Sequence, residues 1–275
     1  MISFRPQARF DKSATLLLIE DGQWKARKFS FRNPKILDAI KGAADAGQFS
    51  AENGEIFPFV LNRKLLLLVG VGKKDKTSLS ALRTTVRRAF LSSFLKKIKD
   101  VEVILHDDAE TAVKAVIAGY AIGTYAWRKY FSVPKDDKTV RDKNVTLAVA
   151  RKASYEETIK ICEGVNLTRN LVNDNADVVH SQYLESVIRG LVKGKKNVKM
   201  EILNRREMKA KGLNLHLAVN QGSNKEPKLI IVKYHGAAYD GKYTAVIGKG
   251  ITFDTGGINL KPSGHIETMR YDMSG

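Results

Sequence analysis

The chain has 275 residues, which is enough for two domains at about 100–200 residues each, and 43% of them are hydrophobic and 28% charged. This composition is typical of a folded globular protein and excludes an intrinsically disordered one. The formal charge of +18 would attract polyanions, but the basic residues are scattered and no nucleic-acid motif accompanies them, so a solvated basic surface is favoured over the alternative of a DNA-binding or architectural protein.

Targeting signals and disulfides are not indicated. No apolar run reaches about 18 residues, and the N-terminus lacks the apolar core of a signal peptide. Cys162 is the single cysteine, so no intrachain disulfide can form, and we interpret it as a small core residue. We therefore expect a cytoplasmic protein without a membrane partner.

Strands and helices alternate along the first half of the chain. Strands are predicted at 14–19, 65–70, 100–105 and 145–149, and helices at 34–47, 80–97 and 109–130. Asp21 and Gly22 are expected to form a turn after the first strand. This alternation indicates a mostly parallel sheet flanked by helices in an N-terminal α/β domain of residues 1–150.

Gly70-Val71-Gly72, followed by two lysines, is similar to a phosphate-binding turn. The third glycine of a dinucleotide-binding loop is missing, and so is the Gly-Lys-Ser/Thr ending of a P-loop. A tight turn with exposed lysines is the favoured interpretation, and a nucleotide-binding module is the alternative.

A second α/β domain is expected over residues 151–275, again with a mostly parallel sheet. It follows a polar loop at 133–138 and begins with a long helix from Ser154. Ser181 is expected to cap the next helix, a basic loop follows at 190–197, and a short helix is predicted at 206–212. Strands are predicted at 198–203, 229–234 and 243–247, the last two joined by a hairpin-like turn at Asp240 and Gly241.

The final stretch carries the residues with the most chemistry. A strand predicted to be buried at 243–248 leads into Lys249 and Asp254, and Asp272 follows eighteen positions after Asp254. Carboxylates are hard oxygen donors that suit divalent cations, and a lysine beside them either pairs as an ion or loses its proton and donates nitrogen. Lys261 would stay charged and could stabilise an oxyanion. A salt-bridged surface turn is the alternative.

Residues 248–262 and 269–275 closely resemble the leucyl aminopeptidase (cytosol aminopeptidase) family. Residues 163–173 resemble the helix that opens its catalytic domain, and residues 217–223 and 229–236 resemble its strands before the site. Residues 119–130 resemble the last helix of its N-terminal domain. The resemblance covers roughly residues 115–275 with specific motifs, and earlier residues only by general pattern.

The resemblance implies a metal-dependent aminopeptidase that removes leucine-type N-terminal residues from peptides, with two divalent metal ions, commonly zinc or manganese, activating a water. Lys249 would be a neutral nitrogen ligand, Asp254 would bridge both ions, and Asp272 would bind the same ion as Lys249. Lys261 would be the electrophile that contacts the peptide carbonyl. The family also implies a homohexamer.

Three departures from the family pattern are visible. Residues 174–177 stand where the family usually has prolines, and His265 and Glu267 are interpreted as surface residues rather than ligands. The family's second motif, Asn-Thr-Asp-Ala-Glu-Gly-Arg, which supplies two further metal carboxylates and an arginine, is not in the sequence. We therefore expect the chain to be the N-terminal part of a longer protein, and to be inactive as it stands.

Overall fold

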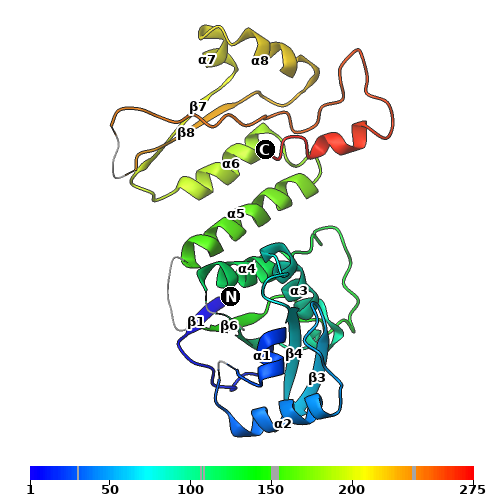
Figure 1. Cartoon of the computed structure of the whole chain (residues 1–275). Helices are drawn as coiled ribbons and strands as arrows, with labels where there is room; N and C mark the ends of the chain where they lie inside the picture. The colour runs from blue at the N-terminus through cyan, green and yellow to red at the C-terminus, as the bar shows by residue number, and fades with distance from the viewer. Residues whose placement is uncertain (30, 106, 108, 150–154, 237–239) are drawn as a thin grey trace. The chain divides into compact units, whose positions relative to one another are not determined.

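The structure is a computed structural model that describes residues 1–29, 31–105, 107, 109–149, 155–236 and 240–275. The chain divides into two compact units, residues 1–166 and residues 167–275, which are described separately (Figure 1). The division falls within helix α5 (Tyr155–Asn173). The predicted domain boundary near residue 150 and the predicted helix start at Ser154 lie outside the described residues.

The first unit is built on a six-stranded sheet. Its neighbouring strands run parallel, except that β3 is antiparallel to β4. The α/β class and the mostly parallel sheet are therefore confirmed for this unit. In spatial order the strands are β1 (Ile2–Arg5), β6 (Asn144–Ala148), β5 (Asp100–Ile104), β2 (Ala14–Glu20), β4 (Lys64–Gly72) and β3 (Ile56–Leu61).

The continuous apolar run of β2 reflects burial on both faces of the sheet. Side chains alternate across a strand, so Leu16 and Leu18 point to one face while Leu17 and Ile19 point to the other. All four are at most 2% exposed. A central strand covered by helices on both faces is the setting in which such an unbroken apolar sequence is stable.

Helices cover both faces of this sheet and make a three-layer unit (Figure 1). On one face pack α3 (Leu79–Leu91) and α4 (Glu110–Ala121), together with the first turns of α5. On the other face pack α1 (Asp21–Ala26) and α2 (Pro34–Asp45). Pro34 stands at the start of α2 as predicted, and the Asn33 side chain accepts a hydrogen bond from the Ile36 amide.

The turn predicted at Asp21 and Gly22 is wrong, because helix α1 begins there. The Glu20 side chain caps the first turn, the Gln23 side chain caps it reciprocally, and Trp24 is buried against the sheet. Strands β1 and β3 were not predicted from the sequence. Strand β3 contains Pro58, which has no N–H to donate to a neighbouring strand. The proline is tolerated because β3 lies at the edge of the sheet.

Two predicted helices are shorter than expected. The helix predicted at 80–97 ends at Leu91 and is followed by the short 3₁₀ helix η1 (Ser93–Leu95). The helix predicted at 109–130 ends at Ala121. Side-chain donors satisfy carbonyls at that end: Asn166 Nδ2 donates to the Ala121 carbonyl at 2.7 Å, and Arg87 Nε donates to the Gly123 carbonyl at 3.0 Å.

Two charged groups are buried in the first unit with full sets of partners. Glu102 on β5 is 0% exposed and accepts from an Arg5 guanidinium nitrogen and from the amides of Arg9 and Phe10, at 3.0 and 2.8 Å. Lys143 is 4% exposed and donates to three backbone carbonyls. Burial lowers the pKa of the Lys143 ammonium.

The second unit contains the end of α5 and one strand pair, in which β7 (Val198–Leu203) and β8 (Leu229–Tyr234) run antiparallel. This differs from the mostly parallel sheet expected there. The chain between the two strands forms three short helical segments and turns back, so that β8 runs alongside β7 in the opposite direction. The helical segments of this unit are α6 (Ser181–Val192), α7 (Arg205–Ala210), α8 (Asn214–Val219), η2 (Asn220–Gly222) and η3 (Ile266–Arg270).

Two local predictions in the second unit are corrected. Ser181 is the first residue of α6 and not its cap; His180 is the N-cap and makes no side-chain capping bond, while the Ser181 hydroxyl donates to the Glu226 carbonyl. Residues 217–223, which resemble a family strand, lie in α8 and η2. The Asn220 side chain fastens this segment by donating to the Lys225 carbonyl at 3.1 Å.

Within the described ranges, no helix is both long and apolar enough to cross a membrane.

Candidate metal centre

The stretch that leads into the candidate site is exposed and extended. Residues 243–248 were predicted to be a buried strand joined to β8 by a hairpin, and the structure contradicts this. Val246 and Ile247 are 94% and 93% exposed, and β8 pairs with β7 instead. Strand-forming side chains stabilise a strand only when a neighbouring strand and a covering face are present, and the described residues offer neither here.

The structure brings together the four residues that the sequence singled out. The Lys249 ammonium donates to the Asp272 carboxylate, and its Nζ lies 3.8 Å from Asp254 Oδ2. Lys261 Nζ lies 3.5 Å from the same Asp254 oxygen. Asp254 therefore stands between two lysines, and Lys249 stands between two carboxylates. The four side chains are each 30–48% exposed, so the cluster is open to solvent.

A tight loop holds two members of this cluster. Asp254 Oδ1 accepts a hydrogen bond from the Gly256 amide at 2.9 Å, and the Lys261 amide donates to the Thr255 carbonyl at 3.0 Å. Gly256 has φ +94°, and a Cβ built on it would lie 2.4 Å from the Asn259 carbonyl oxygen. In the structure, Gly256 is required by the fold of its own loop.

The charge of Asp254 is stabilised locally. The pKa of Asp254 is lowered, first by the hydrogen bond from the Gly256 amide and then by the charges of Lys261 and Lys249. The carboxylate therefore stays ionised through the neutral range, which is the form that binds a cation. The salt-bridged turn and the metal site, which sequence analysis left as alternatives, both require this grouping.

His265 and Glu267 lie on the surface, and neither takes part in the ion pairs of the cluster. Glu267 accepts from the Ser263 hydroxyl at 3.1 Å and from the Gly264 amide at 2.7 Å, so its carboxylate closes the turn before η3. His265 is exposed and is the N-cap residue of η3. The structure thus gives Glu267 a local structural role.

The donor set is small. Among the residues that the structure describes, no group of three or more His, Cys, Asp or Glu side chains could hold a metal ion. The cluster offers two carboxylates and two lysine ammonium groups. Carboxylate oxygens suit divalent manganese or zinc, and a lysine nitrogen becomes a donor only after its ammonium loses a proton.

Gly70-Val71-Gly72 is not a phosphate-binding turn. These residues form the end of strand β4. A Cβ on Gly70 would lie 2.1 Å from the Glu52 carbonyl oxygen, so this glycine is required by close backbone packing. Cys162 is 2% exposed in the core of the first unit, as predicted, and burial raises the pKa of its thiol.

Solved structures with the same fold include aminopeptidases and a maturation enzyme. The bottromycin maturation enzyme BotP in complex with Mn superposes with a TM-score of 0.73 at 21% identity, covering 96% of this chain and 53% of that one. The cytosol aminopeptidase from Coxiella burnetii superposes with a TM-score of 0.70 at 18% identity, covering 100% and 54%. The chain thus has an aminopeptidase fold.

Sequence comparison narrows the class to one family. Residues 166–275 match the profile of the cytosol aminopeptidase family, catalytic domain. The probable cytosol aminopeptidase of Protochlamydia amoebophila is 34% identical over 86% of this chain and 50% of the relative. The cytosol aminopeptidase of Pseudomonas aeruginosa PAO1 is 31% identical over 99% of this chain and 58% of the relative.

The chain belongs to the cytosol aminopeptidase family. It spans about half the length of the curated relatives it matches. None of these relatives or structures is named as a DNA-binding protein, so the DNA-binding alternative gains no support from them.

Proposed function

We propose that the chain is part of a metal-dependent aminopeptidase that removes N-terminal residues, of the leucine type, from peptides. The observation that carries this proposal is the grouping of Lys249, Asp254, Asp272 and Lys261 in a chain of the cytosol aminopeptidase family.

The ligands of the metal would be the Asp254 and Asp272 carboxylates and the Lys249 amine. A neutral amine is the form that coordinates a metal, and a dication between the two carboxylates would favour that form. Manganese is supported by BotP, whose structure is a complex with Mn. Zinc has the same ligand chemistry available here. A second metal ion requires donors other than these three side chains.

Each residue has a distinct task in the proposed reaction. A bound dication supplies Lewis-acid chemistry, which polarises the peptide carbonyl and the attacking water. The Gly256 amide orients the Asp254 carboxylate by donating to its Oδ1 at 2.9 Å. Lys261 places a positive charge 3.5 Å from Asp254, where it can contact the peptide carbonyl oxygen and stabilise the negative charge that develops on it.

The remaining expectations rest on the family. Peptides would be the substrates, the protein would act in the cytoplasm, and the complete enzyme would be a homohexamer. The 275 residues by themselves should bind metal without hydrolysing leucine p-nitroanilide. The family's second motif supplies two more carboxylates and an arginine, and this motif is not in the sequence. Hydrolysis of leucine p-nitroanilide by the isolated chain with Mn²⁺ would show that this expectation is wrong.

Metal binding by the chain can be tested with Mn²⁺. The electron paramagnetic resonance signal of free Mn²⁺ falls when the ion binds, and we expect this with the unmodified chain. Asp254→Asn should restore the free signal, because the amide keeps the shape of the side chain and removes its charge. Asp177→Asn is the matched control, since Asp177 is an exposed aspartate outside the cluster. Equal Mn²⁺ binding by the unmodified chain and Asp254→Asn would contradict the proposal.

Lys261 has a separate test in a longer protein that also carries the Asn-Thr-Asp-Ala-Glu-Gly-Arg motif. Lys261→Ala should leave Mn²⁺ bound and lower kcat by about 10²–10³, the range for loss of one group that stabilises an oxyanion. Loss of metal together with activity would assign Lys261 to the metal instead.

A further inference from the structure

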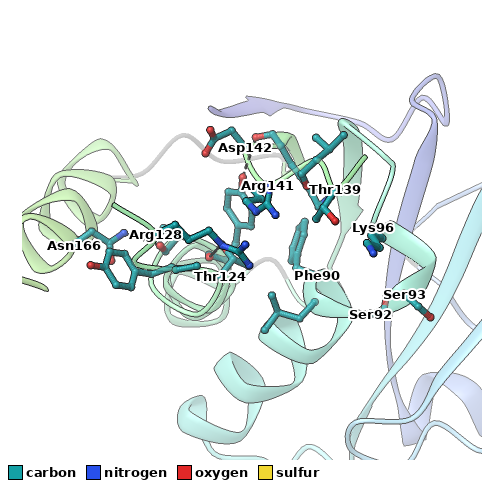
Figure 2. A pocket seen from close by; sticks show the side chains of 17 residues that line it. Phe90, Ser92, Ser93, Lys96, Thr124, Arg128, Thr139, Arg141, Asp142 and Asn166 are labelled. Carbon is teal, nitrogen blue, oxygen red and sulfur yellow. Dashed lines mark hydrogen bonds between the residues drawn. The ribbon is translucent and has the colours of Figure 1, made fainter. Parts of the chain in front are cut away.

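The first unit contains a cavity of about 650 Å³, which the proposed metal centre does not use. It lies where α3 and α4 end, and residues 124–128 and 139–143 complete its wall together with Asn166 (Figure 2). Small-molecule sites in proteins have volumes of about 300–1,000 Å³. The cavity therefore has the size of a site for a small organic molecule.

One side of the cavity is apolar and firmly packed. The rings of Phe90 and Tyr120 lie 4.6 Å apart between centroids, and both are under 9% exposed. The Tyr120 hydroxyl donates to the Lys143 carbonyl at 2.9 Å, which fixes the ring. Leu91 adds an apolar side chain that is 55% exposed. Together these side chains offer an apolar surface to one part of a ligand.

The part of the wall next to Tyr120 is held in place by a buried lysine. The Lys143 ammonium donates to the carbonyls of Leu95, Ile98 and Val140 at 2.6, 2.7 and 2.9 Å. The Val140 amide also donates to the Lys96 carbonyl at 2.8 Å. These bonds tie residues 140–143 to the turn after α3. The wall is therefore set before any ligand arrives, which lowers the entropy cost of binding.

The polar lining is strongly cationic. Four lining residues are basic, namely Lys96, Arg128, Arg141 and Lys143, and Asp142 supplies the single carboxylate. Lys96, Arg128 and Asp142 are exposed, Arg141 is half-buried, and the buried Lys143 ammonium is bonded to three carbonyls. Figure 2 shows the side chains of Arg128 and Arg141 both reaching toward the space beside the Phe90 ring. This arrangement attracts an anionic group.

The two arginines and Lys96 retain capacity to bind. Arg141 is held on one side by the Asp137 carboxylate, and its Nε is buried without an acceptor in the part of the chain that the structure describes. Arg128 and Lys96 form no ion pair with any described residue. A buried donor without an acceptor carries a desolvation cost, and an anionic ligand would remove that cost.

We propose that this cavity binds a small organic anion, with a carboxylate or phosphate group toward Arg128 and Arg141 and an apolar body against Phe90 and Leu91. Both head groups share the same chemistry, because each accepts two parallel hydrogen bonds from a guanidinium. The proposal does not depend on the metal centre, so it stands or falls separately from the proposed function.

Isothermal titration calorimetry of the metal-free chain tests it with phenyl phosphate, 3-phenylpropionate and inorganic phosphate. At least one aromatic anion should bind with one-to-one stoichiometry, and inorganic phosphate should bind about tenfold more weakly or worse, because it lacks the apolar body. Arg128→Gln should weaken the aromatic anion by about tenfold or more. Leu91→Ser should weaken the aromatic anion while leaving inorganic phosphate unchanged.

Arg206→Gln is the matched control, because it makes the same charge change on the exposed surface of α7. It should leave binding unchanged. Three results would overturn the proposal: no heat of binding with either aromatic anion, equal affinity for inorganic phosphate, or equal weakening by Arg206→Gln and Arg128→Gln. The last result would mean that the ligand responds to overall charge rather than to this cavity.

Discussion

Two adjacent glycines allow the loop geometry of the candidate metal centre to be tested by a matched pair of substitutions. Gly256 and Gly257 both have positive φ, at +94° and +79°, so an alanine at either position is placed in a left-handed conformation that costs about 1–2 kcal/mol. The surroundings differ. A Cβ at Gly257 meets no atom within 4 Å, whereas a Cβ at Gly256 would lie 2.4 Å from the Asn259 carbonyl oxygen.

The extra contact at Gly256 forces the backbone to move. A Cβ there would also lie 3.1 Å from the Lys261 amide nitrogen, which donates the hydrogen bond that closes the loop. Gly256→Ala should therefore lose that hydrogen bond, which costs about 1 kcal/mol. This cost adds to the conformational cost and to the cost of moving the backbone to remove the overlap. We expect Gly256→Ala to weaken Mn²⁺ binding by about tenfold or more relative to Gly257→Ala.

The assay is titration of each variant with Mn²⁺, with the free ion measured by electron paramagnetic resonance. Circular dichroism should show the same helix content in both variants, because the loop contains no helix. Equal Mn²⁺ affinities for Gly256→Ala and Gly257→Ala, or a weaker affinity for Gly257→Ala, would refute the claim that this loop positions the ligands.

Four further predictions concern the first unit. Arg5→Ala leaves the buried Glu102 carboxylate without its charged partner. It should lower the free energy of unfolding, measured by urea denaturation, by about 3–5 kcal/mol. A loss below about 1 kcal/mol would show that Glu102 is not charged or not buried in solution. The hydrogen bond from Arg5 lowers the pKa of Asp11 in the folded chain, so ionised Asp11 stabilises the fold at a pH above its unfolded-state pKa, and this stability is lost as the pH falls through the lower folded-state pKa. Asp11→Asn should therefore reduce the dependence of the urea midpoint on pH below about 4. An unchanged dependence would contradict this. Gly70→Ala should destabilise the chain by about 1–3 kcal/mol or more, because its Cβ would overlap the Glu52 carbonyl. Equilibrium dialysis should show no ATP binding to the unmodified chain, and ATP binding would restore the nucleotide-binding alternative.

In the described part of the chain, the elements that the sequence predicted well are those whose apolar pattern follows directly from burial. A short, unbroken apolar run such as β2 or β4 is stable mainly as a strand covered on both faces, and both strands were predicted to within two residues at either end. Helix α1 was missed because Asp21-Gly22 favours a turn locally, and the capping box and the burial of Trp24 outweigh that preference. Tertiary contacts decided the structure there.

The strand predicted at 243–248 is wrong because the contacts that it needs are missing among the described residues. Its residues have high strand propensity, but propensity needs a neighbouring strand to become structure, and Val246 and Ile247 are exposed. The ligand candidates were found because the motif is nearly continuous from Lys249 to Lys261. The cavity was not found, because its lining comes from four separate segments and no local motif marks it.

Lys249 and the two aspartates, Asp254 and Asp272, are the proposed ligands of a divalent metal. Pulsed electron paramagnetic resonance of Mn²⁺ bound to a chain carrying ¹⁵N-labelled lysine tests this claim most directly. We predict a ¹⁵N hyperfine coupling that is lost in Lys249→Met and retained in the control Lys242→Met, whose lysine lies outside the cluster. Bound Mn²⁺ without a ¹⁵N coupling, or a coupling that survives Lys249→Met, would contradict the claim.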